Sequence, residues 1–456
     1  MHKAKYYSQV AANQLITMSD KKNLVKNILS LSIVQVANYV LPLASVPIIV
    51  RIIGPDSYGT INYYSSFVAY FMLLINYGFD YSGTRYIAID KDNIERRNEH
   101  FTKILCAKSI LFAASVILFC ASIFFISKSP SETKVALYTF LITIAWVLSP
   151  NWFFQGMQRL TQVALFNFLT RLIFTVLILV IIRQKSDYIW QPLVLSLTQI
   201  LVSVISVLYA VKKFHIKLVK ITLSSVWTLL WEDRMIFFSM LATNLYTDTN
   251  IVILGFFETK QHVGYFTAAW KLLFVFLVLL SLPVSQALFP YIAEFFSRDK
   301  QKGIDQIKRL LPIIIYLSLG MSIVLYFLAG VLIHGFYGSQ FDATILIFRI
   351  LTIVPVLSFI NTVLGLQTMI NLKMDKAYFA IIFTGGVFSV IFNLVIVNLY
   401  GYIGCAWSWI IAETIIAFAM HKYLKNKGYD LFETSYFMPK AILLEVKTFV
   451  VNFKKK

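Results

Sequence analysis

The chain has 456 residues, of which 58% are hydrophobic and 14% are charged, and its mean hydropathy is +0.72. This composition excludes an ordinary soluble domain, in which about a quarter of the residues are charged. The net charge of +19 does not indicate nucleic-acid binding, because the lysines and arginines gather on alternate loops, as they do in membrane proteins with positive cytoplasmic loops.

Twelve apolar runs of about 20 residues follow one another, and this length crosses a bilayer as an α-helix. The first run is too long for the apolar part of a signal peptide, so we interpret it as the first span. The positively charged loops lie on the same side as both ends of the chain, which predicts cytoplasmic termini. The predicted spans are residues 28–50, 60–82, 104–126, 134–154, 161–182, 188–211, 235–257, 263–288, 310–333, 343–368, 376–398 and 401–424.

The short loop after the first span, GPDSYG, has a counterpart after the seventh span. In both places a helix ends at a glycine, and a second glycine precedes an aromatic-rich helix. The matching pairs are Gly54 and Gly255 (201 positions apart), Gly59 and Gly264 (205) and Pro150 and Pro355 (205). Unless these coincide by chance, they indicate two parallel copies of a six-helix unit with a cavity between them.

We therefore predict an all-α polytopic membrane protein with about 12 transmembrane helices in two six-helix bundles around a central cavity. A basic, aromatic linker separates the bundles, and it is interpreted either as a surface helix at the membrane interface or as a solvated connection. The predicted divisions are a cytoplasmic tail (1–27), the first bundle (28–211), the linker (212–234), the second bundle (235–424) and a basic cytoplasmic tail (425–456).

A charge inside a membrane span is costly and usually faces a cavity or a partner, and three of the basic residues within predicted spans are candidates for such a role. Arg171 lies near the middle of its span, so we expect it to face a cavity rather than form a structural pair. Lys108 lies about one turn into its helix, and we expect its side chain to reach the cytoplasmic surface. Lys271 lies about two turns from the outer end of its span, so it can either face the cavity or extend to the membrane surface, and both interpretations stay open.

Two carboxylates within spans are also candidates. Asp248 lies in a polar cluster, NLYTDTN, that needs water or a ligand at this depth. Glu413 has no other charge near it in the sequence and either pairs with Arg171 or titrates alone. Basic side chains in a cavity attract phosphate, and buried carboxylates can carry a proton or a sodium ion. We expect H⁺ or Na⁺ as a coupling ion and no other cofactor.

Four prolines within three of the predicted spans are candidate hinges: Pro42 and Pro47 in the first span, Pro283 in the eighth and Pro355 in the tenth. Each removes a backbone donor and bends its helix, so the bent helices either open and close a cavity or are static kinks. No nucleophile, phosphate-loop or metal-ligand motif occurs, and the three cysteines and six histidines are scattered. We therefore predict a protein that is not an enzyme and has no metal site.

Four segments resemble the polysaccharide-biosynthesis flippases, the O-antigen transporters. They are the helix and loop around PIIVRIIGPDSYG, the segment NWFFQGMQRL, the segment DTNIVILGFF with VGYFTAAWKL, and GYIGCAWSWIIAE. In the first, the matching positions are Pro47, Arg51, Gly54, Tyr58, Gly59, Gly78, Phe79 and Arg85. The matches extend over residues 25–425, and their order and spacing carry the resemblance.

The resemblance implies a fold similar to that of MATE drug exporters. It implies transport of an undecaprenyl-diphosphate-linked oligosaccharide, an O-antigen or similar surface-polysaccharide unit, from the cytoplasmic to the periplasmic leaflet of the bacterial inner membrane. Arg171 and Lys271 would then meet the diphosphate or acidic sugars, with Arg51 and Arg85 near the two mouths. The coupling-ion or gating candidates are Asp248 and Glu413. The implied partners are membrane lipids and the polymerase and chain-length regulator of the same pathway.

Two other functions are weighed against this one. A MATE-like exporter of drugs or metabolites would have the same fold, but acidic residues would suit its cavity better for cationic drugs. A membrane polysaccharide polymerase would need a large outer loop with catalytic residues, whereas all the predicted outer loops of this chain are short. We rank the exporter second and the polymerase third.

Overall fold

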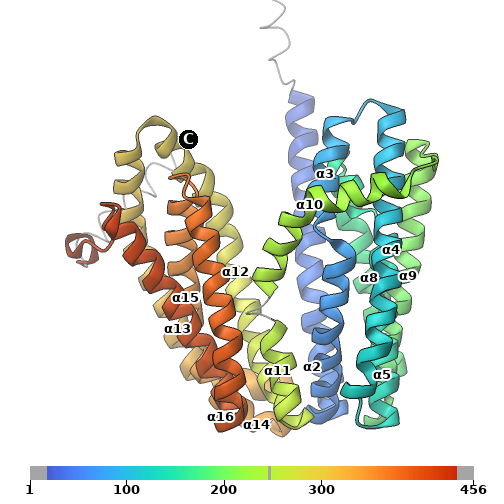
Figure 1. Ribbon diagram of the computed structural model, residues 1–456. Coiled ribbons are helices and arrows are strands. Elements are labelled where there is room, and N and C mark those ends of the chain that lie inside the picture. The colour runs from blue at the N-terminus through green and yellow to red at the C-terminus, as the bar shows by residue number, and fades with distance from the viewer. Residues whose placement is uncertain (1–17, 245–247, 439–456) are drawn as a thin grey trace, which may run out of the picture.

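The computed structural model describes residues 18–244 and 248–438, and it describes their side chains except at 18–44, 243, 248, 280–287, 289 and 290. The elements in these ranges are all helical. They form two lobes that touch at one end and diverge at the other, so that the described chain has the shape of a V (Figure 1). We call the touching end the closed end and the diverging end the open end.

The first lobe contains the helices up to the middle of the chain. Their bounds are α2 (Met18–Asn76), α3 (Phe79–Ile89), α4 (Ile94–Ile126), α5 (Pro130–Phe140), α6 (Ile142–Leu148), α7 (Asn151–Gly156), α8 (Leu160–Ile181), η1 (Lys185–Ile189) and α9 (Trp190–Phe214). The remaining elements are α10 (Leu223–Asn244), α11 (Asp248–Phe257), α12 (Lys260–Arg298), α13 (Lys300–Tyr337), η2 (Ser339–Phe341), α14 (Asp342–Leu351), α15 (Val354–Asn361), η3 (Thr362–Met369), α16 (Asp375–Asn426) and η4 (Thr434–Phe437).

Two of these helices are each a pair of spans joined at a glycine. Helix α2 is interrupted at Gly54 (φ 75°), and α16 is interrupted at Gly401 (φ 59°). Only glycine adopts such positive φ values without strain, so the chain turns there at the closed end. With these turns counted, the described helices cross the molecule twelve times, which confirms the predicted fold class of two six-helix bundles. Eight of the described helical segments are long and apolar enough to span a membrane.

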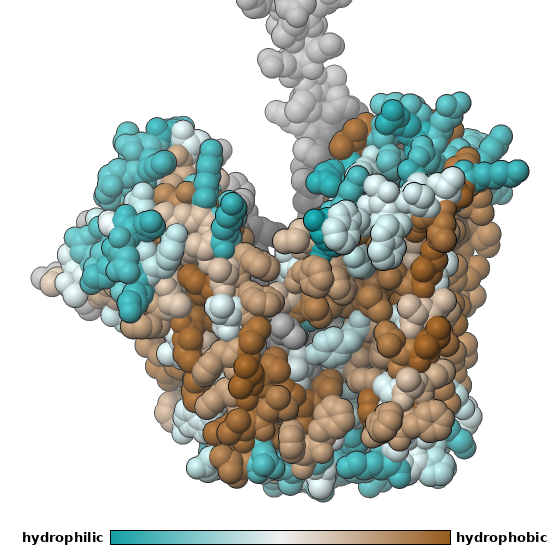
Figure 2. Space-filling model, in the orientation of Figure 1, coloured by the Kyte–Doolittle hydropathy of each residue, from teal (hydrophilic) through white to brown (hydrophobic). Residues whose placement is uncertain are grey.

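The outer surface has an apolar belt between two hydrophilic rims (Figure 2). Phe124 and Phe125 are 85% and 87% exposed, and Phe327 is 75% exposed. Aromatic rings so exposed to water would be unfavourable, whereas lipid tails accept them. The belt therefore marks the membrane-facing surface of both lobes.

The linker between the bundles contains a surface helix. Helix α10 begins at Leu223 and runs obliquely along the first lobe toward the second (Figure 1). Leu223, Trp227 and Trp231 follow one another at four-residue spacing and are all at least 60% exposed. This apolar stripe is typical of a helix that lies at a membrane interface, which is the first of the two interpretations of the linker.

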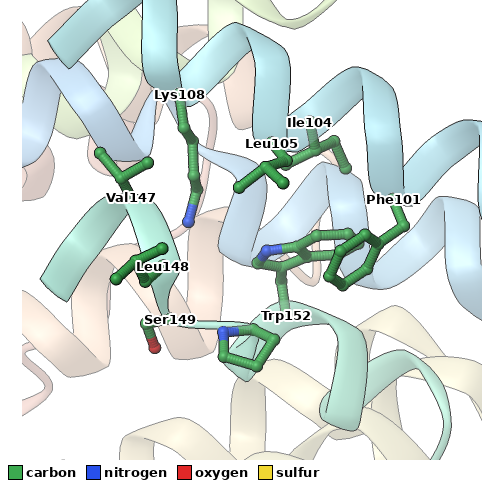
Figure 3. Close-up of a pocket in the computed structure, with 9 residues that line it drawn as sticks. Phe101, Ile104, Leu105, Lys108, Val147, Leu148, Ser149 and Trp152 are labelled. Carbon is green, nitrogen blue, oxygen red and sulfur yellow. The ribbon is translucent and has the colours of Figure 1, made fainter. Parts of the chain in front are cut away.

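Lys108 differs from its expected place at the surface. Its side chain is only 2% exposed, and it points into a small pocket beside Trp152 and the end of α6 (Figure 3). Its Nζ donates a hydrogen bond of 3.2 Å to the backbone oxygen of Trp146. In a continuous helix that oxygen would accept from residue 150, but Pro150 has no N–H. Lys108 thus replaces the missing donor where the fourth span breaks, and the prediction of a surface position is wrong.

Candidate substrate cavity

A cavity of about 590 Å³ lies between the two lobes. Its walls come from both lobes, since α2, α8 and α9 face α12 and α13 across it. The described residues that line it are Val46, Pro47, Tyr58, Ile61, Asn62, Ser65, Met72, Thr139, Ile142, Arg171, Gln191, Pro192, Leu195, Ser196, Lys271, Leu272, Phe274, Val275, Val278, Phe336 and Tyr337. Toward the open end, the molecular surface is hollowed between the lobes (Figure 2).

The structure brings two of the predicted site residues, Arg171 and Lys271, to this one cavity. Arg171 lies on α8 in the first lobe, and Lys271 lies on α12 in the second. Both side chains are exposed in spite of their position inside membrane spans. Among the described lining residues there is no aspartate or glutamate. The two cations therefore give the described walls a positive charge, which suits an anionic ligand.

Lys271 also joins the two lobes. Its Nζ donates a hydrogen bond of 2.5 Å to Oδ1 of Asn62, and it lies 5.8 Å from the centre of the Tyr58 ring. Both partners belong to α2 in the first lobe. Sequence reasoning did not single out Asn62, because an asparagine within an apolar span is not distinctive until its partner across the cavity is known.

The closed end forms the floor of the cavity, where glycines paired by their offset in the sequence meet. A Cβ atom on Gly59 would lie 1.7 Å from the backbone oxygen of Lys260, and one on Gly264 would lie 2.0 Å from that of Pro55. A Cβ atom on Gly255 would lie 2.1 Å from the Tyr63 ring. Real Cβ atoms cannot approach so closely, so glycine allows the two lobes to pack backbone against backbone.

Polar contacts reinforce this packing. Arg51 donates to the backbone oxygens of His334, at 3.0 Å, and Gly335. Gln340 in turn donates to the backbone oxygen of Arg51 at 3.2 Å. Arg51 was expected near a mouth of the cavity, and the structure places it at the closed end, where it links α2 to α13.

Lys260, which was not among the predicted site residues, also contacts the other lobe at the closed end. The Nζ of Lys260 lies 3.2 Å from the centre of the Tyr63 ring, which is a cation–π contact between the lobes. Lys260 lies in the short loop ETKQH, and the only available signal was its place in the copy of the first outer loop.

Arg85 lies on α3, away from the described cavity walls. Its guanidinium is 5.4 Å from the centre of the Tyr86 ring, and the Tyr86 hydroxyl donates to Asp233 of α10 at 3.0 Å. Burial raises the pKa of Tyr86, and Asp233 raises it further. Arg85 thus belongs to the junction of α3 and α10 rather than to the cavity that holds Arg171.

Glu413 is buried in the second lobe and lies outside the cavity. Its carboxylate accepts from Nδ2 of Asn361 at 2.5 Å and from Nε1 of Trp409 at 3.4 Å. The structure therefore separates Glu413 from Arg171, which lies in the first lobe. The Trp409 ring packs on Trp270, 4.0 Å away between ring centres, and Trp270 precedes Lys271.

The remaining coupling candidate, Asp248, begins α11, and its side chain lies outside the described residues. Two neighbours of Asp248 are described. The hydroxyl of Thr249 bonds that of Tyr70 across the lobes, and Oδ1 of Asn250 accepts from Asn393 at 2.8 Å. Within the described part of the chain, no group of three or more histidine, cysteine or acidic side chains is placed to hold a metal ion.

Two of the four hinge candidates, Pro47 and Pro355, have described side chains. Pro47 lines the cavity on α2, and Pro355 stands in the first turn of α15, a position that proline tolerates well. The side chains of Pro42 and Pro283 lie outside the described residues. Pro355 therefore starts a helix, while Pro47 stands within one.

Two six-helix lobes, packed together at one end and parted at the other around a cavity within membrane spans, form the architecture of a multi-pass membrane transporter. The profile of the polysaccharide biosynthesis protein family matches residues 24–296, and the chain belongs to this family. Over 409 residues, the chain is 25% identical to a protein of Escherichia coli (strain K12) named as an O-antigen transporter, with 90% of this chain and 98% of that protein covered.

Two solved structures share the fold. The lipid II flippase MurJ in its inward closed conformation has a TM-score of 0.70 at 15% identity, over 93% of this chain and 92% of MurJ. An inward-facing multidrug resistance MATE transporter has a TM-score of 0.69 at 15% identity, over 86% of this chain and 94% of that transporter. These likenesses concern the fold, and they confirm the expected similarity to the fold of MATE exporters.

Proposed function

We propose that this protein is a flippase that moves an undecaprenyl-diphosphate-linked oligosaccharide from the cytoplasmic to the periplasmic leaflet of a bacterial inner membrane. The observation that carries the proposal is the cavity between the lobes, with Arg171 and Lys271 on opposite walls and no carboxylate among its described lining residues. Two cations that line one cavity match a diphosphate, and arginine can hold phosphate oxygens with two parallel hydrogen bonds.

The proposed orientation puts the open end in the cytoplasm. The loops there carry most of the lysines and arginines, and the described chain begins and ends on that side. The positive-inside rule therefore favours cytoplasmic termini. In this orientation the structure corresponds to a state that accepts its substrate from the cytoplasmic leaflet.

The lipid and glycan parts of the substrate would take different routes. The polyprenyl tail would stay in the bilayer, and the sugars would cross through the cavity. An unpaired polar group in hydrocarbon costs several kcal/mol, so a glycan with many hydroxyl groups needs such a polar route. An O-antigen or similar surface-polysaccharide unit fits this proposal, in a pathway where a polymerase and a chain-length regulator act next.

Ion coupling and bending complete the proposed cycle. Asp248 and Glu413 are the proposed coupling or gating groups, with H⁺ or Na⁺ as the ion. Glu413 is suited to this because its contacts lead through Trp409 and Trp270 to the helix of Lys271. The proposed bending points are Pro42, Pro47, Pro283 and Pro355.

The exporter alternative shares the fold, but the walls of this cavity differ from what a cationic drug requires. The described lining offers cations and neutral polar groups, and it would repel a positively charged drug. The charge of the cavity therefore favours the lipid-linked anion over a cationic substrate.

The test measures in which leaflet the lipid-linked oligosaccharide accumulates. Cells with and without the protein would be treated with an impermeant glycan probe from the periplasmic side, and an Arg171→Ala variant would be compared with Arg183→Ala as a matched control. Arg183 follows the same helix but lies at its outer end. We expect loss of probe signal on deletion, with synthesis intact, and restoration by the control but not by Arg171→Ala. Normal translocation with unextended chains outside would instead indicate a polymerase.

A further inference from the structure

A second cavity of about 330 Å³ lies between α8 and α9 and adjoins the central cavity. Arg171 and Leu195 line both cavities. We call it the α8–α9 pocket. Its described lining residues are Asn167, Thr170, Arg171, Phe174, Thr175, Leu195 and Gln199.

The pocket continues the cavity wall toward the open end. On α9, Gln191, Leu195 and Gln199 are spaced four residues apart, so they share one helical face. The first two line the central cavity, and the last two line the pocket. On α8, Asn167 stands one turn before Arg171. Because α8 and α9 run in opposite directions, Asn167 and Gln199 both lie on the open side of Arg171.

The polar groups of the pocket are neutral except for Arg171. Asn167 is exposed and Gln199 is partly exposed, and among the described residues neither amide has a hydrogen-bond partner. An amide left against lipid tails would be costly, whereas one that faces a cavity can bind water or a ligand. The two amides thus lie inside the span region with both donors and acceptors available.

We infer that the α8–α9 pocket is a glycan subsite, in which Asn167 and Gln199 bind sugar hydroxyl groups while Arg171 at its inner edge meets the diphosphate. The inference rests on the proposed function and refines it. An amide both donates and accepts hydrogen bonds, as a sugar hydroxyl does, and Phe174 adds an apolar face for the C–H side of a sugar ring. The volume of the pocket lies within the range of about 300 to 1,000 Å³ for small-molecule sites.

In this arrangement the pocket would discriminate between substrates that carry different glycans. The cations recognise what every diphosphate-linked substrate shares, whereas the amides contact what differs between glycans. A site that hydrogen-bonds a hydroxyl group discriminates strongly against an analogue that lacks it, because its own polar groups are then left unpaired.

The test compares two ligands of the purified protein in liposomes. One is the lipid-linked oligosaccharide isolated from cells that make it, and the other is undecaprenyl diphosphate without sugar. The variant is Asn167→Leu with Gln199→Leu, which keeps the side-chain size and removes the amides. The matched control is Thr198→Val, since Thr198 is buried next to Gln199 and does not line the pocket.

We expect the double variant to bind the oligosaccharide about tenfold more weakly, the change for two lost neutral hydrogen bonds, and to bind undecaprenyl diphosphate as the unmodified protein does. The control should bind both ligands normally. Equal binding of the oligosaccharide by variant and unmodified protein, or an equal loss for both ligands, would overturn the subsite. If the unmodified protein bound neither ligand, the proposed function itself would fail.

Discussion

The closed end and the open end of the molecule are built in different ways. At the closed end, two glycines of opposite lobes bring backbones into contact, and Arg51, Lys260 and Lys271 reach across from one lobe to the other. At the open end, the lobes part, and polar and charged side chains cover each rim separately (Figure 2). The described state is therefore held by close packing at one end of the molecule, so a change there should alter the conformation more than a change at the rims.

The largest effect is expected from Gly59→Ala. The new Cβ would meet backbone atoms of α12, which cannot move aside as a side chain can. Overpacking of this kind costs about 1–3 kcal/mol, enough to shift the balance of states roughly 5- to 150-fold away from the closed end. A cysteine introduced at Ser65, after replacement of the three natural cysteines, should then react faster with an impermeant thiol reagent from outside.

The matched control is Gly320→Ala on α13, where nothing lies within 4 Å of the added Cβ. It should leave both labelling and transport unchanged. If Gly59→Ala labelled like the control and transported normally, the glycine contact would not hold the lobes together.

The next effect separates the two roles of Lys271. Asn62→Leu removes the hydrogen bond between the lobes but keeps the cation in the cavity, whereas Lys271→Met removes both. A buried hydrogen bond to a charged group contributes about 1.5–3 kcal/mol, and this one contributes less because Lys271 is exposed. Both variants should increase outside labelling at position 65, but only Lys271→Met should weaken binding of undecaprenyl diphosphate. Equal binding losses in the two variants would assign the ligand contact to Asn62 as well.

A smaller effect on stability is expected from Lys108→Met, which leaves the backbone oxygen of Trp146 without its donor. A buried acceptor without a partner costs about 1–3 kcal/mol, and the thermal midpoint in detergent should fall. Pro150→Ala restores an N–H at the position that a continuous helix would use. Lys108→Met should therefore cost less in the Pro150→Ala background, and an identical cost in both backgrounds would refute the replacement of one donor by the other.

The smallest effect concerns the rim of the second lobe, where Lys308 bonds Glu433 at 2.9 Å. Lys308 lowers the pKa of Glu433 in the folded protein. The stabilisation from this ion pair is therefore lost as the pH falls below about 4.3, the pKa of glutamate in an unfolded chain, and through the lower pKa of Glu433 in the folded protein. Glu433 raises the pKa of Lys308 in the folded protein. The same stabilisation is therefore also lost as the pH rises above about 10.4, the pKa of lysine in an unfolded chain, and through the higher pKa of Lys308 in the folded protein. Limited proteolysis of residues 430–438 should accordingly be slowest near neutral pH. In the Lys308→Met variant, the rate of this proteolysis should no longer depend on pH in this way. A persistent pH dependence would assign the titration to another pair.

The sequence predicted the architecture because composition and the length of apolar runs depend on the bilayer and not on tertiary contacts. Twelve spans and their division into two lobes follow from these signals and from the glycine offsets. Arg171 and Lys271 were found in the same way, because a charge within a span is unusual wherever its partners lie.

The sequence could not predict contacts that depend on how the spans pack. Lys108 was expected at the surface since it stands near a helix end, but the break at Pro150 offers it a buried acceptor in another span. Asn62 and Lys260 become informative only after α2 and α12 are placed together. Glu413 meets Asn361 rather than Arg171 because the two charges belong to different lobes, a fact that spacing along one chain does not encode.

The contact between Gly59 and Gly264 limits which residues can replace either glycine. The two positions are paired by the 205-residue offset in the sequence, and each lies against the other, so the contact has the form of an isologous dimer interface, in which each patch meets its own counterpart. In two identical six-helix units that associate in this way, one glycine would serve both surfaces, and its replacement would introduce two clashes at once. In the single chain each glycine faces the backbone of the other lobe, so neither can be enlarged alone, and two residues 205 positions apart are restricted in size by one contact.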